Sequence, residues 1–341
     1  MRLKDLGEGP LIKLLEERFA EPHPRIVKAI GDDAAVTLQS DGACLLSTTD
    51  IMVEDVHFSL AYTSPYLLGR KSVSISLSDI AAMGGRPCFL LVSLAMPPST
   101  EGEFIDELYR GIKDSSEEFG VRLIGGNSSA SSDGDGEGGG LVVGTTVLGE
   151  AERAAVLLRS GAQPGETVFV TGTLGDAALG LKALKENGQA ALEGPLGRAA
   201  MKQLDPAPRV REGEELAKRG LASAMIDVSD GLVRDLKHIC SESGVGAEVE
   251  LGRLPLSDLM KGCLSENPEL KHLPLSGGED YELLFTAPEG KEREVSRLAE
   301  ETGTLITPIG RVLPPEKGVT VIGEDGRPVS LASDGFEHFT R

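Results

Sequence analysis

Six aspartates lie in short motifs flanked by glycine, serine or threonine: Asp32, Asp33, Asp50, Asp79, Asp227 and Asp230. Carboxylates at strand ends and turns are poor core material, but their hard oxygen atoms are the ligands that Mg²⁺ prefers. The chain has a formal net charge of -20, so a site that gathers carboxylates would repel an anionic substrate unless cations intervened. The motifs therefore raise the hypothesis that several Mg²⁺ ions hold the phosphates of a nucleotide.

The sequence context of each aspartate decides how strongly it supports this hypothesis. Asp79 stands in a stretch of small and apolar residues over 76–83, where an ionised carboxylate needs a partner, and this favours a metal. Asp33 could equally well form an Asx turn or cap a helix. Asp227, Ser229 and Asp230 follow an expected strand over 222–226, and capping of the next helix explains only one of the three.

Composition excludes several other classes of function. The acidic balance, the 4% of aromatic residues and the absence of tryptophan argue against a nucleic-acid partner. Apolar runs stay well short of the roughly 20 residues that a membrane span needs. The four cysteines are scattered without a C-x-x-C pair, which is typical of a reducing compartment. We therefore expect a cytoplasmic protein that binds neither nucleic acid nor membrane.

Hydrophobic spacing predicts the order of helices and strands. Helices are expected over 10–19, 65–83, 104–119, 209–219 and 232–243, with a further helix at the end of 172–185. Strands are expected over 43–49, 88–95, 121–124, 141–148, 167–170, 222–226, 282–286, 305–312 and 319–322. This order predicts an α+β fold, with an N-terminal mixed sheet that carries helices on one face and a C-terminal α/β domain. The expected domains are 1–150 and 151–341.

A polar, glycine-rich segment over 128–140 is expected to be a mobile loop. Its residues 134–139 match G-x-G-x-x-G, but no expected strand directly precedes them and no helix follows, so the match is spurious. Elsewhere the chain lacks the P-loop motif, the protein-kinase motifs and G-x-S-x-G. We therefore expect neither phosphoryl transfer of the P-loop or protein-kinase type nor serine-hydrolase chemistry.

Together, the motifs resemble the thiamine-monophosphate kinases, of the superfamily that includes aminoimidazole ribonucleotide synthetase. The resemblance runs from Gly7-Glu8 to Gly335-Phe336-Glu337-His338-Phe339, essentially the whole chain. It implies a homodimer in which the N-terminal domain binds ATP and magnesium, while the C-terminal domain closes over the active site. The implied reaction transfers the γ-phosphoryl group of ATP directly to thiamine monophosphate, giving thiamine diphosphate.

The resemblance also implies roles for particular residues. The magnesium ligands would be Asp32, Thr48, Thr49, Asp50, Asp79, Asn127, Asp227 and Asp230. Contacts to ATP would come from Tyr109, Gly126, Asn127, Arg159 and Ser229, and contacts to the thiamine phosphate from His57, Glu279 and Phe336. No residue is expected to act as a general base, because the attacking phosphate oxygen is already ionised near neutral pH.

Two positions depart from the family pattern. Asn127 occupies the place of an aspartate, so its amide oxygen could ligate Mg²⁺ without contributing charge, and Asp55 replaces a glycine two residues before His57. A non-catalytic nucleotide-binding regulator is the alternative from another class, and Asn127 is the feature that favours it. Selenophosphate synthetase and the hydrogenase-maturation member would need cysteines at the N-terminal segment and the C-terminus, where this chain has none.

Overall fold

The computed structural model describes residues 7–131 and 140–338, and these residues form two six-stranded sheets. In the N-terminal sheet the strand order is β1-β2-β3-β6-β4-β5. Its strands are β1 Ile26–Lys28, β2 Ala35–Leu38, β3 Cys44–Val53, β4 Arg86–Met96, β5 Arg122–Ala130 and β6 Val142–Ala151. Only the β4–β5 pair is parallel, so the sheet is mixed, as the sequence predicted.

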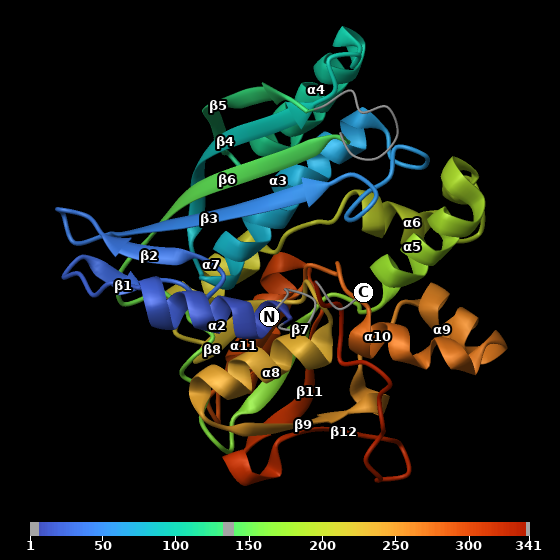
Figure 1. Cartoon of the computed structure of the whole chain (residues 1–341). Helices are drawn as coiled ribbons and strands as arrows, with labels where there is room; N and C mark the ends of the chain where they lie inside the picture. Colours follow the sequence, from blue (N-terminus) through green and yellow to red (C-terminus); the bar gives the residue numbers. More distant parts are fainter. Residues whose placement is uncertain (1–6, 132–139, 339–341) are drawn as a thin grey trace.

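The C-terminal sheet has the order β12-β9-β11-β7-β10-β8. Its strands are β7 Thr167–Thr171, β8 Ala224–Asp227, β9 Gly246–Glu250, β10 Leu283–Ala287, β11 Ile306–Leu313 and β12 Val319–Ile322. The β9–β12 pair is parallel and the other pairs are antiparallel. Figure 1 shows the N-terminal sheet above the C-terminal one.

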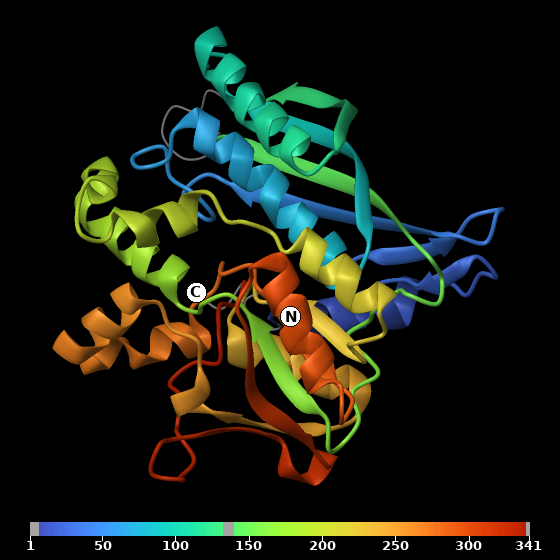
Figure 2. The ribbon, with the colours of Figure 1, turned by 180° about the vertical axis from the view of Figure 1, so that it is seen from behind.

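The helix α3 Pro65–Ala82 lies between the two halves of the molecule. It begins sharply because the Ser64 side chain accepts the Leu67 N–H and Pro65 occupies the first turn. The helix contacts strands β3, β4 and β6 of one sheet and β8 of the other, so it is buried almost all round rather than along one stripe. Seen from behind in Figure 2, α4 Gly102–Glu118, α7 Val210–Lys218 and α11 Glu292–Thr302 continue this helical layer.

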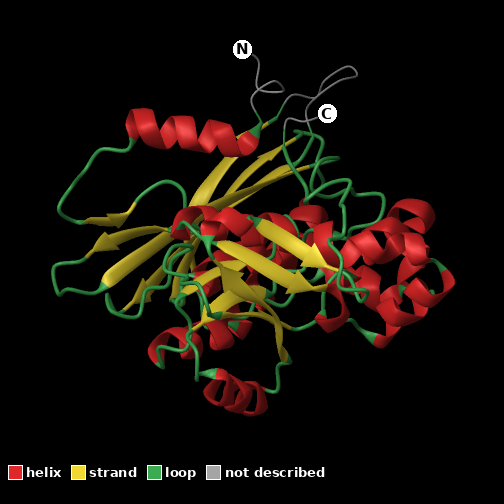
Figure 3. Cartoon of the chain, turned by 90° about the horizontal axis from the view of Figure 1, so that it is seen from below, coloured by secondary structure: helices red, strands yellow, loops and turns green. Residues whose placement is uncertain are grey.

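Six further helices and four 3-10 turns complete the described part of the chain. They are α2 Glu8–Phe19, α5 Asp176–Asn187, α6 Gly197–Leu204, α8 Leu232–Ser243, α9 Asp258–Glu266 and α10 Leu273–Ser276, with short 3-10 turns η1 Gly188–Leu192, η2 Leu251–Arg253, η3 Pro268–His272 and η4 Pro315–Lys317. Helix α8 packs on β8, β9, β10 and β12. Figure 3 shows α2 set apart from the bulk of the helices. Within the described ranges, no helix combines the length and apolar character that a membrane crossing requires.

The α+β fold class predicted from the sequence is confirmed, and several elements match closely. Helix α8 and strand β12 have the predicted bounds, and α3 differs from its prediction by one residue. The loop prediction for 128–140 is wrong at its start, because β5 continues to Ala130. Parallel backbone pairing with β4, from Phe89 to Met96, holds these polar residues in a strand. The rest of the predicted loop, 132–139, lies outside the described residues.

Candidate active site

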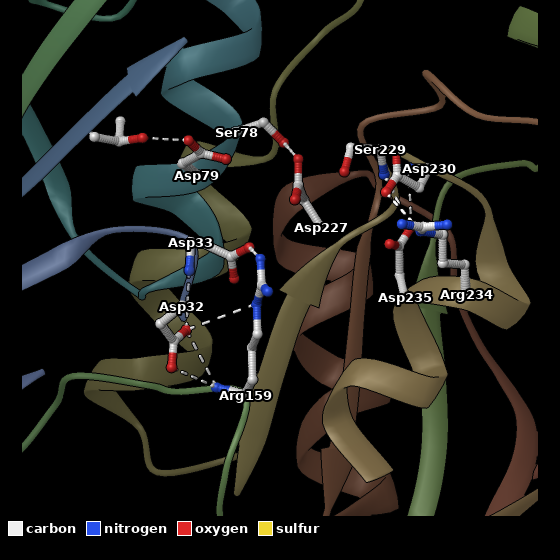
Figure 4. Close-up of polar contacts among 11 residues, drawn as sticks. Asp32, Asp33, Ser78, Asp79, Arg159, Asp227, Ser229, Asp230, Arg234 and Asp235 are labelled. Atoms are coloured by element: carbon white, nitrogen blue, oxygen red, sulfur yellow. Dashed lines mark hydrogen bonds and ion pairs between the residues drawn. The ribbon is translucent and has the colours of Figure 1, made fainter. Parts of the chain in front are cut away.

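Three carboxylates that are far apart in the sequence meet between the two sheets (Figure 4). Asp33 comes from the loop before β2, Asp79 from the last turns of α3 and Asp227 from the end of β8. One oxygen of each lies within 4.8 Å of the other two, and we call these three residues the acidic cluster. Such a set of oxygens suits a divalent cation. Burial of three ionised carboxylates without a neutralising cation would be costly.

Hydroxyl groups orient these carboxylates. Ser78 of α3 donates a 2.6 Å hydrogen bond to Asp227, and Thr48 of β3 donates one to Asp79. Two residues beyond Thr48 on β3, Asp50 accepts a 2.6 Å bond from Ser76, which lies about one helical turn before Asp79. Each bond leaves the other carboxylate oxygen available for a ligand. The site is therefore held in place by α3 and β3 rather than by flexible surface side chains.

The electrostatic properties of the site also favour a cation. Burial and, next in size, the charge of the neighbouring Asp33 raise the pKa of Asp227 to about 7. Burial, followed by the charges of Asp50 and Asp227, raises the pKa of Asp79 well above its usual value. Ionised carboxylates this close repel one another, so a bound cation would return them to the charged form. The residues present therefore fit a Mg²⁺ site.

Arg159 supplies a positive charge beside the cluster. Its Nη2 atom donates a 2.6 Å hydrogen bond to Asp33, and its backbone N–H lies 3.3 Å from a carboxylate oxygen of Asp32. Both aspartate side chains are almost fully buried, at 0% and 1% exposure for Asp32 and Asp33. Burial and the adjacent Asp33 raise the pKa of Asp32 to about 6. Asp33 is therefore a member of the acidic cluster, whereas Asp32 accepts the backbone N–H of Arg159 and lies outside it.

The turn after β8 is held by a carboxylate that the sequence analysis did not single out. Asp235 accepts hydrogen bonds of 3.1, 3.2 and 3.0 Å from the backbone N–H groups of Ser229, Asp230 and Gly231. Burial raises the pKa of Asp235 well above its usual value, and Asp230 raises it further. The turn thus presents Ser229 and the Asp230 side chain toward the space beside the cluster (Figure 4).

A cleft of about 1040 Å³ opens next to this turn and draws its walls from both halves of the chain. The predicted site residues that line it are Thr49, Asp50, His57, Ser229, Asp230, Glu279 and Phe336. Apolar side chains such as Met52, Phe58 and Tyr281 form much of the rest. A cleft with an apolar wall, an aromatic ring and carboxylates at one end suits a heteroaromatic molecule that carries a phosphate.

Three residues that line the cleft adopt a left-handed backbone conformation. They are Asp55 (φ 61°), Glu279 (φ 68°) and Tyr281 (φ 49°). Aspartate tolerates this region better than most residues, so Asp55 can keep the conformation that favours glycine. Strained conformations of this kind persist only where surrounding contacts fix them, and they gather at ligand sites.

The surroundings of Glu279 show how that turn is fixed. Its carboxylate accepts a 2.7 Å bond from the buried Lys71 of α3 and a second bond from Gln203 of α6. Its neighbour Asp280 accepts the Gly175 N–H at 2.7 Å, and burial raises the pKa of Asp280 to about 8. The turn is therefore tied to three helices, and Glu279 stands at the cleft wall with a fixed carboxylate.

Three of the predicted ATP contacts lie elsewhere in the chain. Tyr109 packs against the N-terminal core from α4, while Gly126 and Asn127 lie on the exposed edge strand β5. Three strand steps, from β3 through β6 and β4, separate Asp50 from Asn127, which is roughly 14 Å at the usual strand spacing. Within one chain these residues are therefore not brought together with the acidic cluster.

Gly126 has a local reason to be glycine. A Cβ atom there would stand 1.8 Å from the Val92 carbonyl oxygen, so no larger residue fits without moving the strand. The close approach of β5 to β4 depends on this position. This structural constraint is sufficient to explain why residue 126 is glycine. The contact of Gly126 with a nucleotide stays a prediction.

Comparison with known proteins identifies the class of the fold. The family AIR synthase related protein, N-terminal domain, matches residues 31–151, and the corresponding C-terminal domain family matches residues 163–323. The solved structure of AaThiL complexed with AMPPCP and TMP superposes with a TM-score of 0.83, at 34% identity and 99% coverage of both chains. The two-domain architecture described above is therefore that of the AIR synthase related proteins.

Curated relatives narrow the assignment. The thiamine-monophosphate kinase of Bacillus subtilis is 39% identical over 326 residues, covering 93% of this chain and 95% of the relative. That of Aquifex aeolicus is 37% identical over 344 residues, covering 99% and 100%. This chain therefore belongs to the thiamine-monophosphate kinase family and is an enzyme.

Proposed function

We propose that this enzyme transfers the γ-phosphoryl group of ATP to the phosphate of thiamine monophosphate, giving thiamine diphosphate and ADP. The observation that carries the proposal is a cleft of about 1040 Å³, lined by Asp50, Asp230 and Phe336, close in the chain to the acidic cluster, whose Asp227 lies three residues before Asp230. The full-length relative AaThiL, complexed with AMPPCP and TMP, supports both substrates. A cytoplasmic location is part of the proposal, and the four free cysteines are compatible with it.

Mg²⁺ ions would be held by the acidic cluster together with Asp50, Asp230 and the hydroxyl groups of Thr48 and Thr49. Bound there, Mg²⁺ would neutralise phosphate oxygens and hold the nucleotide and the acceptor in line. Asp32 stays a candidate ligand, although one of its carboxylate oxygens lies 4.0 Å from Nε of Arg159. Asn127 remains a candidate through its amide oxygen, in the setting of the dimer proposed below.

The residues of the chain perform the remaining tasks of binding and alignment. Arg159 presents a guanidinium fork that suits phosphate oxygens, and Ser229 offers a hydroxyl group at the end of the turn. His57, Glu279 and Phe336 would hold the thiamine part, with the Phe336 ring against a ring of the substrate. The acceptor oxygen is ionised already, so transfer needs no general base and no phosphoenzyme, and we propose a direct in-line displacement.

Release of ADP, measured with coupled enzymes, tests the proposed reaction. We expect ADP release with thiamine monophosphate and none above background with thiamine, because the acceptor is the phosphate. Formation of thiamine diphosphate should equal ADP release mole for mole. Binding of ATP without turnover of thiamine monophosphate would instead support a nucleotide-binding regulator.

The first prediction is that ATP stabilises the folded protein only when Mg²⁺ is present. A ligand that binds the native state raises its melting temperature, but the acidic cluster would repel ATP without cations. Thermal melts with ATP and EDTA should therefore match those of the free protein, whereas ATP with Mg²⁺ should raise the midpoint. Equal shifts in both conditions would rule out the cation bridge.

We also propose that the enzyme is a homodimer, built on domains 1–150 and 151–341, in which the N-terminal domain mediates dimerisation. The N-terminal sheet exposes apolar side chains on the face of β3 and β4 opposite α3, where Ile51 and Phe89 lie, and on the edge strand β5, which carries Leu123 and Ile124. Exposed apolar surface of this kind is typical of an interface. A second chain on this surface would also explain why Tyr109, Gly126 and Asn127 lie apart from the acidic cluster of their own chain.

The second prediction tests the dimer by charging this surface. Ile124→Asp should yield a monomer in sedimentation experiments and should abolish most of the activity, because a charge cannot be buried unpaired in an apolar interface. Leu305→Asp is a matched control, since Ile124 and Leu305 are both 54% exposed and Leu305 lies before β11 in the C-terminal half. A dimer that survives Ile124→Asp with full activity would exclude this surface as the interface.

A further inference from the structure

Arg234, near the start of α8, connects three segments that border the cleft. Its guanidinium forms ion pairs with Asp230 (Nε to Oδ2, 3.0 Å), Glu8 (Nη2 to Oε2, 3.6 Å) and Glu337 (Nη1 to Oε2, 3.6 Å). The side chain of Arg234 is only 16% exposed. Figure 4 shows it directed at the Asp230 turn. One buried cation is thus shared by the turn after β8, the N-terminal helix and the C-terminal end of the described chain.

Residues 335–338, which we call the C-terminal segment, are also fixed to this turn through the backbone. The Phe336 N–H donates a 3.0 Å hydrogen bond to the carbonyl oxygen of Asp230. A Cβ atom at Gly335 would stand 2.7 Å from the same oxygen and 2.9 Å from the Cβ of Arg234, so the close approach requires glycine. The segment therefore rests on the Asp230 turn and on Arg234 at once.

The C-terminal segment delivers two rings to the cleft. Phe336 and His338 both line it, and their rings meet edge to face with centroids 4.8 Å apart. His338 Nε2 lies 3.4 Å from Nε2 of His57. The Val53 N–H donates to His57 Nδ1 at 3.0 Å, so the proton of a neutral His57 is on Nε2, where it can be donated to His338. The segment thereby reaches the N-terminal half of the cleft.

The charges around Arg234 connect the position of the segment to the metal site. Three carboxylates share one guanidinium, so they repel one another even in the presence of Arg234. A cation held by Asp230 would reduce that repulsion and leave Arg234 to Glu8 and Glu337. Binding of the metal and closure of the segment on the cleft should then strengthen each other, because coupling between two sites is reciprocal.

We propose that Arg234 is a positioning residue that couples the metal site at Asp230 to the part of the cleft that binds the acceptor, by anchoring Glu337 and hence Phe336 and His338. This inference rests on the proposed function for the identity of the acceptor, thiamine monophosphate. It assigns to Arg234 no contact with either substrate.

A nearby ion pair provides a matched control. Lys237 lies one turn further along α8 and pairs with Asp334, next to the C-terminal segment, but the two side chains are 45% and 50% exposed. Exposed pairs of this kind contribute little to stability. Lys237→Gln therefore removes a charge and a tie between the same two elements, without touching Asp230 or Glu337.

The experiment compares Arg234→Gln, Glu337→Gln and Lys237→Gln with the wild type in three measurements. These are deuterium exchange of the C-terminal peptide without ligands, the KM for thiamine monophosphate and the Mg²⁺ concentration at half-maximal rate. Arg234→Gln should speed exchange and raise both other quantities, each by about tenfold, which lies in the usual range of coupling between sites. Glu337→Gln should speed exchange, raise the KM and, by the same reciprocity, raise the Mg²⁺ requirement, and Lys237→Gln should alter none of the three.

Each outcome bears on the proposal. If a folded Arg234→Gln protein kept the wild-type exchange rate of the C-terminal peptide and the wild-type KM for thiamine monophosphate, the proposal would be overturned. It would also be overturned if Lys237→Gln changed these quantities as much as Arg234→Gln does. If Arg234→Gln fails to fold, an unchanged KM and exchange rate in Glu337→Gln would overturn it by the same reasoning. Faster exchange in Arg234→Gln, in a protein whose wild type does not use thiamine monophosphate, would support the anchor and reject the proposed function.

Discussion

Asp79→Asn should lower the rate of phosphoryl transfer by at least about tenfold, which corresponds to roughly 1.4 kcal/mol of transition-state stabilisation. The substitution keeps the shape of the side chain but removes one of the three charges of the acidic cluster. Thr48 can still donate its hydrogen bond to the amide oxygen, so the local fold should survive. Steady-state rates at saturating substrates and Mg²⁺ measure the effect.

Stability measurements separate this effect from damage to the fold. In EDTA the variant should be at least as stable as the wild type, because burial and the charges of Asp50 and Asp227 already disfavour an ionised Asp79. Mg²⁺ should then stabilise the wild type more than the variant. Asp258→Asn, at a fully exposed position, is the control and should leave rate and stability unchanged. Wild-type turnover in Asp79→Asn would show that this carboxylate is structural.

The carboxylates of the site could be found from the sequence because their surroundings are unsuited to charge. Asp79 is the clearest example, since small and apolar neighbours predict burial and burial demands a partner. Asp227 was found in the same way, at the end of an apolar strand. The three-dimensional meeting of these residues could not be predicted, because it depends on strand order and on the position of α3 between the sheets.

The choice between Asp32 and Asp33 shows a limit of the same reasoning. The sequence offers two adjacent carboxylates after Gly31, and their separation by one residue says nothing about which side chain faces Asp79 and Asp227. In the structure Asp33 lies in the acidic cluster, while Asp32 faces the backbone of Arg159. A contact with a distant arginine decides the orientation, and no local pattern contains that information.

The serines of α3 are another group that the sequence analysis did not assign. Ser72, Ser74, Ser76 and Ser78 alternate with apolar residues, a spacing that suggests a strand more than a helix. All four are buried in α3, and Ser76 and Ser78 donate to carboxylates of the site. A helix buried on all sides has no polar face, so its small polar residues are used for close packing and for orienting ligands. That role becomes visible only with the tertiary structure.

Arg159→Met should be among the most destabilising substitutions in this protein, with an expected loss of about 3–5 kcal/mol in the free energy of unfolding. The guanidinium is the charged partner of Asp33 at 2.6 Å and lies 4.0 Å from Asp32, and both carboxylates are almost completely buried. Removal of the guanidinium leaves two buried carboxylates without a counterion, and methionine fills most of the volume that is vacated. Urea unfolding in EDTA measures the loss.

The dependence on pH gives this prediction a second readout. Burial and the charge of Asp33 raise the pKa of Asp32 to about 6 in the folded protein, although the charge of Arg159 lowers it. Removal of Arg159 would therefore raise the pKa of Asp32 further. An acid with a raised folded-state pKa binds its proton more tightly when folded, so it favours folding at low pH and opposes it as pH rises through that value. The loss in the free energy of unfolding that Arg159→Met causes should therefore be larger at pH 8 than at pH 5.

Arg86→Met is the control for this substitution, because Arg86 pairs with Glu150 at 2.9 Å where both side chains are more than half exposed. Arg86→Met should lower the free energy of unfolding by less than about 1 kcal/mol, and this loss should vary little with pH over the same range. If Arg159→Met unfolded at the same urea concentration as Arg86→Met, the buried pair would not support the fold. Arg159 would then be retained for phosphate binding alone, and the variant should show a defect in the KM for ATP with normal stability.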